Sequence, residues 1–189
     1  MQEKGLNSKT INKENKKMKK TVMVLAMICM ALSIYAGTFD GLTSTGLNYE
    51  YRDGKNLGGM SIEHFGYVND FPLGYYISTN ADFNFNDGSD MTINMMAAPI
   101  YRYMIGNVPM SIDAAFGLSA SGVWFDGRNE FQLGIGGYIG ATYYMNDMIA
   151  LLIGCKLGYD MLSVDLNTGN AAFSGEFYAS PAISIGFRY

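Results

Sequence analysis

The last thirteen residues alternate between apolar and small or polar side chains, and the chain ends on an aromatic residue. One parity contains Phe177, Ala179, Pro181, Ile183, Ile185, Phe187 and Tyr189, and the other contains Tyr178, Ser180, Ala182, Ser184, Gly186 and Arg188. Because successive side chains of a β-strand point to opposite faces, this segment has one apolar face and one face of small or polar side chains. The pattern predicts an amphipathic strand at the C-terminus.

Seven further runs of the same period precede this strand. The eight runs cover residues 45–52, 58–65, 73–84, 91–103, 110–121, 131–143, 149–161 and 177–189. Short turns are expected at 53–56, 67–72, 86–90, 106–109, 126–130 and 145–148, and a longer loop at 162–172. Alternating runs of about ten residues joined by short turns are the sequence signature of a transmembrane β-barrel. An even number of strands without a helical pattern predicts an all-β fold, an antiparallel up-and-down eight-stranded transmembrane β-barrel with both termini at one end.

The composition of the two faces favours a membrane barrel over a soluble ligand-binding barrel such as a lipocalin. The apolar face carries almost no charge, and its aromatic residues gather at the strand ends, as at the two membrane interfaces. A Lys or Arg facing the bilayer midplane costs about 2–4 kcal/mol, so the charged face should line the lumen. The strand charges of this face form an expected internal network: Glu50, Arg52, Glu63, Asp82, Arg102, Asp113, Lys156, Asp160, Glu176 and Arg188.

The lumen is expected to be polar and largely filled. Buried charges persist only when they are paired, and an eight-stranded barrel is only just wide enough for its own side chains. Six larger side chains share the inward parity: Tyr76, Met96, Ile100, Tyr138, Leu152 and Tyr178. The alternative is a narrow channel for small polar solutes or ions, gated by breaking the contacts between Arg or Lys and the carboxylates.

Residues 1–36 have the pattern of a secretory signal peptide. Met18, Lys19 and Lys20 precede an apolar run at 22–32, and Ala36 is the small residue expected before a cleavage site. The run is shorter than the about 20 residues of a transmembrane helix. We expect translation to start at Met18, although residues 1–17 also fit a long n-region.

The segment that remains after cleavage, residues 37–189, is expected to form one acidic domain. It contains six Lys or Arg and fifteen Asp or Glu, which gives a net charge of −9. Such a charge offers no electrostatic footprint for nucleic acid. We therefore expect no nucleic-acid partner.

No residue pattern predicts catalysis, a cofactor or a metal site. His64, the only histidine, lies on the apolar parity of its strand and is expected to face lipid, away from the inward serines. A Ser–His–acid triad needs the base within hydrogen-bond reach of the nucleophile. The glycines of 134–140 lack the spacing and the following helix of a nucleotide loop. Asp87 and Asp90 lack the spacing of a calcium loop.

The mature chain resembles the small eight-stranded bacterial outer-membrane β-barrels of the OmpA/OmpX-like, porin-type superfamily. The resemblance covers residues 37–189 and rests on the strand pattern, while Ile185, Phe187 and Tyr189 resemble the C-terminal insertion signal of such barrels. It implies Sec-dependent export to the outer membrane of a Gram-negative envelope, with outer-membrane lipids and the barrel-assembly machinery as partners.

The orientation and role that this resemblance implies are also expectations. With a periplasmic N-terminus, the turns at 53–56, 86–90, 126–130 and 162–172 lie outside the cell, where they offer a surface for an extracellular ligand. The expected function is a non-enzymatic role in envelope structure or surface interaction. The alternatives are the narrow channel and a lipid-modifying enzyme, for which the chain lacks a credible nucleophile–base pair.

Overall fold

The computed structural model describes residues 40–68, 71–84, 90–125 and 127–189 of the 189-residue chain. These residues form eight strands: β1 (Asp40–Arg52), β2 (Lys55–Tyr67), β3 (Leu73–Phe83), β4 (Met91–Met104), β5 (Met110–Trp124), β6 (Glu130–Tyr144), β7 (Ile149–Asp165) and β8 (Ala171–Arg188). Within the described part of the chain, no helix is long and apolar enough to cross a membrane. The predicted signal peptide, the start at Met18 and most of the turn at 86–90 lie outside the described residues.

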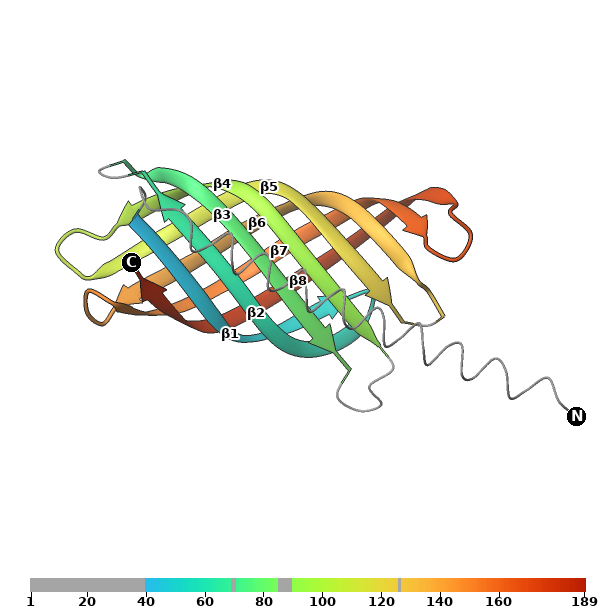
Figure 1. Ribbon diagram of the computed structural model, residues 1–189, viewed down its shortest axis with the longest axis horizontal. Helices are drawn as coiled ribbons and strands as arrows, with labels where there is room; N and C mark the ends of the chain where they lie inside the picture. Colours follow the sequence, from blue (N-terminus) through green and yellow to red (C-terminus); the bar gives the residue numbers. More distant parts are fainter. Residues whose placement is uncertain (1–39, 69–70, 85–89, 126) are drawn as a thin grey trace, which may run out of the picture. The chain divides into compact units, whose positions relative to one another are not determined.

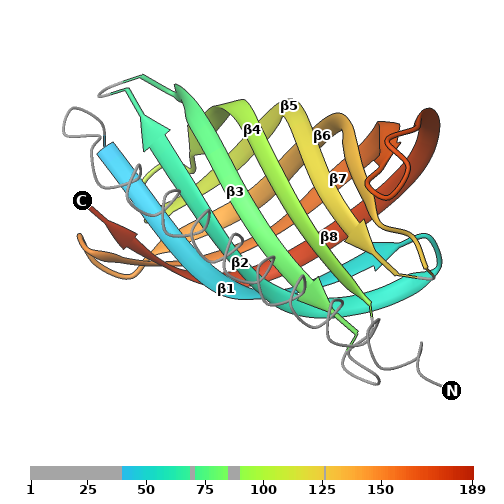
Figure 2. The same cartoon turned by 45° about the vertical axis from the view of Figure 1, so that its right-hand side comes forward.

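Each strand pairs antiparallel with the next along the chain, and β8 pairs with β1, which closes the sheet into a barrel (Figure 1). The strands run obliquely around the barrel axis (Figure 2). Asp40 and Tyr189 lie at one end, which we call the terminal end, and the hairpin turns β1–β2, β3–β4, β5–β6 and β7–β8 lie at the opposite, distal end. The predicted eight-stranded antiparallel up-and-down barrel is confirmed.

The contact between the first and last strands closes the sheet. The backbone N–H of Gly41 donates to the carbonyl of Tyr189, and the N–H of Tyr189 donates to the carbonyl of Gly41, both at 3.0 Å. Farther along the seam, the strands approach so closely that a Cβ at Gly46 would lie 2.1 Å from the carbonyl oxygen of Ile183. Closure removes the unpaired strand edges that lipid does not tolerate.

The longer loop expected at 162–172 is wrong. β7 continues to Asp165 and β8 already begins at Ala171, so five residues join them. A β-bulge in β7 hides the continuation, because Met161 is an extra residue relative to the adjacent Leu133 and Gly134 of β6. Met161 and Leu162 are both exposed, by 37% and 42%, so the alternation reverses at the bulge although the strand continues.

The first hairpin is also tighter than expected. β1 and β2 extend to Arg52 and Lys55, which leaves Asp53 and Gly54 as a two-residue turn. Both residues have positive φ, 48° and 75°, as a type I′ turn requires.

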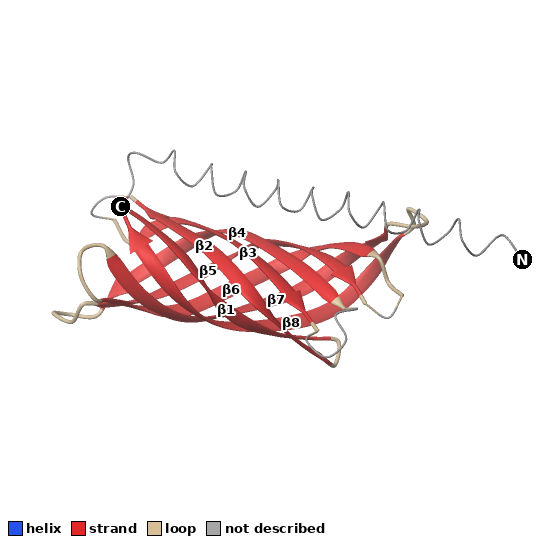
Figure 3. Cartoon of the chain, turned by 60° about the horizontal axis from the view of Figure 1, so that its bottom comes forward, coloured by secondary structure: helices blue, strands red, loops and turns tan. Residues whose placement is uncertain are grey.

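The outer surface of the barrel is apolar. Three apolar side chains in the middle of their strands, Leu47, Leu118 and Ile183, are exposed by 72%, 71% and 67%. Exposed aromatic side chains lie toward both ends: Tyr51, Phe83, Phe131, Tyr159 and Phe173 distally, and Tyr101, Tyr103, Tyr143, Phe187 and Tyr189 at the terminal end. An apolar band between two aromatic girdles, on a barrel joined by short loops (Figure 3), is the surface that a bilayer solvates.

Candidate functional site

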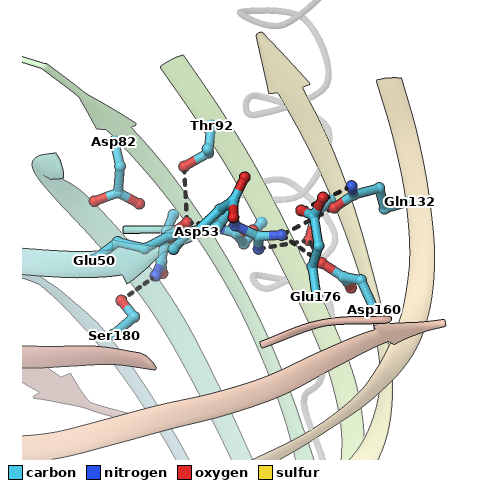
Figure 4. Close-up of polar contacts among 12 residues, drawn as sticks. Glu50, Asp53, Asp82, Thr92, Gln132, Asp160, Glu176 and Ser180 are labelled. Atoms are coloured by element: carbon cyan, nitrogen blue, oxygen red, sulfur yellow. Dashed lines mark hydrogen bonds and ion pairs between the residues drawn. The ribbon is translucent and has the colours of Figure 1, made fainter. Parts of the chain in front are cut away.

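The lumen is the candidate functional site, and Arg52 is the centre of its distal half. The side chain is fully buried. Its Nε donates to Glu50 at 2.8 Å, and its Cζ lies 4.3 Å from the ring centroid of Tyr178. The two η nitrogens donate to four further partners on β4, β5, β6 and β7: Asn94, Ser121, Gln132 and Asp160. Figure 4 shows Glu50, Gln132 and Asp160 among these contacts. Arg52 therefore connects six of the eight strands.

A second buried pair lies between Lys156 and Glu63, with 3.1 Å between Nζ and Oε1. Glu63 also accepts hydrogen bonds from Tyr76 at 3.0 Å and Ser44 at 3.3 Å, while Lys156 donates to Asn80. The carboxylate thus has three donors, which is the condition under which a buried charge is tolerated.

Amide and hydroxyl groups connect the Lys156–Glu63 pair to a third buried carboxylate, Asp82. Asn80 donates to Ser180 at 2.9 Å, Asn48 donates to the same hydroxyl at 3.2 Å, and Asn48 also donates to Asp82. Asp82 is fully buried, and its second oxygen, like one oxygen of Asp160, has no hydrogen-bond partner. Buried acids therefore exceed buried bases here, and neutral donors compensate for part of the difference.

The terminal half of the lumen is closed by an apolar and aromatic cluster, which we call the aromatic plug. Its centre is formed by Phe65, Tyr76 and Tyr138, whose ring centroids lie 4.7–5.8 Å apart. Leu42, Met96, Ile100 and Leu152 pack around these rings. Tyr76, Met96, Ile100, Tyr138, Leu152 and Tyr178 are all at most 3% exposed, so their inward orientation is confirmed. The polar interior that the sequence predicts is therefore interrupted at the aromatic plug.

A third charged group lies between the aromatic plug and the terminal end. Asp113 is fully buried and accepts from Nε of Arg102 at 2.9 Å and from the Tyr67 hydroxyl at 3.0 Å. Ser111 and Thr142 donate to its other oxygen at 3.0 and 2.9 Å. The guanidinium of Arg102 stacks on Tyr67, with 3.4 Å from Cζ to the ring centroid.

The other two expected network residues lie at the mouths of the barrel. Glu176 pairs with Arg128 at the distal end, and Arg188 pairs with Asp40 at the terminal end through two hydrogen bonds of 2.9 Å. The structure therefore separates the ten expected charges into the Arg52 group in the distal half, the Lys156–Glu63 group beside the aromatic plug, the Arg102–Asp113 pair at the terminal side of the plug, and the two mouths. Arg128 and Asp40 were missed because both lie outside the predicted alternating runs.

Comparison with known proteins agrees with this geometry. No protein family and no curated sequence matches the chain. The structure of Neisserial surface protein A aligns with 81% of this chain and 98% of its own, at 15% identity and a TM-score of 0.56. The N-terminal barrel domain of Pseudomonas aeruginosa OprF aligns with 79% of this chain and 98% of its own, at 14% identity and a TM-score of 0.51. Yersinia pestis Ail, solved with the heparin analogue sucrose octasulfate, aligns with 80% of this chain and 99% of its own, at 13% identity and a TM-score of 0.52.

This chain has the fold of the eight-stranded outer-membrane β-barrels. The low identities establish a common fold, and the apolar band between two aromatic girdles gives this barrel the surface that the outer membrane requires.

His64 of this barrel differs from its expected position. The imidazole is on the outward parity, but it is 6% exposed rather than facing lipid, so that expectation is wrong. Nδ1 lies 2.9 Å from Thr43 Oγ1 and 3.0 Å from the Tyr189 hydroxyl, and Nε2 lies 2.8 Å from the Tyr75 hydroxyl. Both ring nitrogens of His64 therefore contact hydroxyl groups. A catalytic triad needs a carboxylate on one of these nitrogens to orient the ring, and His64 has none there. Among the described residues, no group of His, Cys, Asp and Glu could hold a metal ion.

Proposed function

We propose that this barrel is a non-enzymatic, non-conducting scaffold of the outer membrane, with a role in envelope structure or surface interaction through its distal end. The filled lumen is the observation that carries the proposal. Charged groups tied by hydrogen bonds occupy the distal half, and the aromatic plug occupies the terminal half. A solute would have to break the contacts of Arg52 and then displace Tyr76 and Tyr138. Both barriers oppose a steady flow.

The charge of the distal end indicates the kind of ligand that this surface would favour. Its described carboxylates are Asp53, Asp90, Glu130, Asp165 and Glu176, whereas its described cations are Lys55 and Arg128, and both cations already contact carboxylates. Ail has been solved with a sulfated polyanion. An acidic rim would repel such a molecule, so a partner with exposed positive charge fits this barrel better.

Neutralising exposed carboxylates of the distal turns tests the surface role. A variant with Asp53→Asn and Asp165→Asn should fold, because Asn also tolerates the positive φ of residue 53, and its side-chain oxygen can accept the hydrogen bonds that Asp165 takes from the N–H groups of residues 167 and 168. Purified protein should keep the gel-mobility shift on boiling that a folded barrel shows. Outer-membrane vesicles carrying the variant should bind less of a cationic polypeptide, such as polylysine, than vesicles carrying the unaltered protein.

Asp147→Asn, in the terminal turn 145–148, is the matched control and should leave polylysine binding to intact vesicles unchanged, because that end is expected to face the periplasm. Equal binding by the two variants and by the unaltered protein would contradict a surface role for the distal end.

The narrow channel is the second candidate, and the unpartnered buried oxygens of Asp82 and Asp160 favour it, because such atoms attract water or cations. Efflux of a small ion or sugar from vesicles separates the two functions. We expect no efflux above that of protein-free vesicles. Measurable efflux through the unaltered protein, with a higher rate in the Tyr138→Ala variant because the aromatic plug is opened, would favour the channel.

A further inference from the structure

A cavity of about 820 Å³ opens at the terminal end, beyond the aromatic plug. Its lining includes Tyr67, Arg102 and Tyr144 from the lumen side and Asp40 and Arg188 from the seam. The cavity is separate from the distal surface of the proposed function, so the inference below goes beyond that role.

Two guanidinium groups of the cavity surround one aromatic ring. The Cζ atoms of Arg102 and Arg188 each lie 5.6 Å from the ring centroid of Tyr144. Arg102 uses Nε to pair with Asp113, and its Nη2 is buried without a hydrogen-bond partner. Arg188 uses Nε and Nη2 to hold Asp40, which leaves Nη1 outside the pair, and its side chain is 39% exposed. Arg188 therefore retains an accessible donor for an oxyanion, and Arg102 adds positive charge to the lining of the cavity.

The charge of the cavity points to a zwitterionic ligand. Arg102 and Arg188 are balanced by Asp113 and Asp40, so a simple anion would bring uncompensated negative charge into the site. Asp40 is 33% exposed and can accept more hydrogen bonds than the two from Arg188. A phosphodiester beside the arginines, together with a primary ammonium beside Asp40, would satisfy both kinds of group.

The rim of the cavity is apolar and open to the surface. Phe71, Tyr103 and Met104 line it and are exposed by 56%, 58% and 50%. Tyr101 and Tyr103 belong to the terminal aromatic girdle, which marks the level of the lipid headgroups. A ligand that reaches the arginines from this side can keep hydrocarbon chains against the rim.

We propose that this cavity binds the headgroup of a phosphatidylethanolamine molecule from the adjacent leaflet. Arg188 contacts the phosphodiester beside the positive charge of Arg102, Asp40 accepts from the ammonium, and the acyl chains lie along Phe71, Tyr103 and Met104.

Native mass spectrometry of the purified protein in detergent tests this assignment. The probes are phosphatidylethanolamine, phosphatidylcholine and phosphatidylglycerol with identical acyl chains. One phosphatidylethanolamine should remain bound at a concentration about tenfold lower than either of the others requires, because the choline nitrogen has no N–H and the glycerol headgroup has no cation. Equal retention of the three lipids would overturn the proposal.

Two variants and a matched control connect retention to this cavity. Arg188→Gln should weaken retention of all phospholipids, whereas Asp40→Asn should weaken retention of phosphatidylethanolamine and leave that of phosphatidylcholine unchanged. Both side chains are more than 30% exposed, so the variants should fold, which the gel-mobility shift on boiling verifies. Arg128→Gln, at the distal mouth, is the control and should change nothing.

Two results contradict the proposal directly. Retention of phosphatidylethanolamine that is unchanged in both the Arg188→Gln and Asp40→Asn variants would place the lipid elsewhere. Displacement of the lipid by an equal concentration of glycerophosphoethanolamine would show that the acyl chains contribute nothing, so the ligand would be a soluble headgroup rather than a membrane lipid.

Discussion

Loss of the Arg52 side chain should destabilise the barrel more than loss of any surface charge. Arg52 donates five hydrogen bonds and is fully buried, as are its partners Glu50 and Asp160. Arg52→Met preserves most of the volume but leaves two buried carboxylates without their cation. Removing one partner of a buried ion pair costs about 3–5 kcal/mol, so we expect a loss of that size in the free energy of unfolding.

Removing all three charges should restore most of this stability. In the triple variant Arg52→Met, Glu50→Gln, Asp160→Asn, none of the three charges of this group remains, and the two new amides can still exchange hydrogen bonds with neighbours such as Asn94. Replacing a whole buried ion pair with neutral groups is often neutral or even stabilising. The triple variant should therefore be more stable than Arg52→Met alone.

Urea-dependent unfolding in phospholipid vesicles measures these differences, and the fluorescence of Trp124, the only tryptophan, reports on folding. Arg128→Gln is the matched control, because Arg128 also pairs with a carboxylate, Glu176, but is 24% exposed. An exposed pair is worth at most about 1 kcal/mol. The reasoning is refuted if Arg52→Met costs no more than Arg128→Gln, or if the triple variant is no more stable than Arg52→Met.

Two further predictions concern closure and insertion of the barrel. Gly46→Ala should cost about 1–3 kcal/mol in the same urea experiment, because its Cβ would lie 2.1 Å from a backbone oxygen of β8, whereas Gly137→Ala, with its nearest atom at 3.5 Å, should be tolerated. Equal costs would show that the seam is not tightly packed. Tyr189→Ala should lower the amount of boiling-sensitive barrel in cells more than Tyr143→Ala, an exposed tyrosine at the same end, if the C-terminal residue is part of an insertion signal. Equal yields would contradict that role.

The strands were predictable because one physical rule acts along each of them. A strand between lipid and a narrow lumen must alternate, so Leu47 and Tyr49 face out while Asn48 and Glu50 face in, and the sequence contains this information locally. The rule fails at a bulge. Met161 is an extra residue of β7, and the reversed parity beyond it led to the prediction of a loop.

The partners of the inward side chains were less predictable, because parity gives the direction of a side chain but not its height in the barrel. The pairing of Arg52 with Asp160 depends on the stagger of strands that are far apart in the sequence. His64 shows the same limit on the outer face. Its parity indicated lipid, but Tyr75 of β3 and the C-terminal Tyr189 cover the ring. Tyr75 is on the neighbouring strand, but only the closure of the sheet between β1 and β8 brings Tyr189 to this ring.

The most direct test of the closed lumen is single-channel recording in a planar bilayer, with purified protein whose gel mobility shifts on boiling. We expect no discrete conductance steps from barrels that are shown to be inserted, because the contacts of Arg52 and the aromatic plug close both halves of the lumen. Discrete steps whose size changes when Lys156→Gln or Arg102→Gln removes a luminal charge would contradict the closed lumen and assign the barrel to the channels.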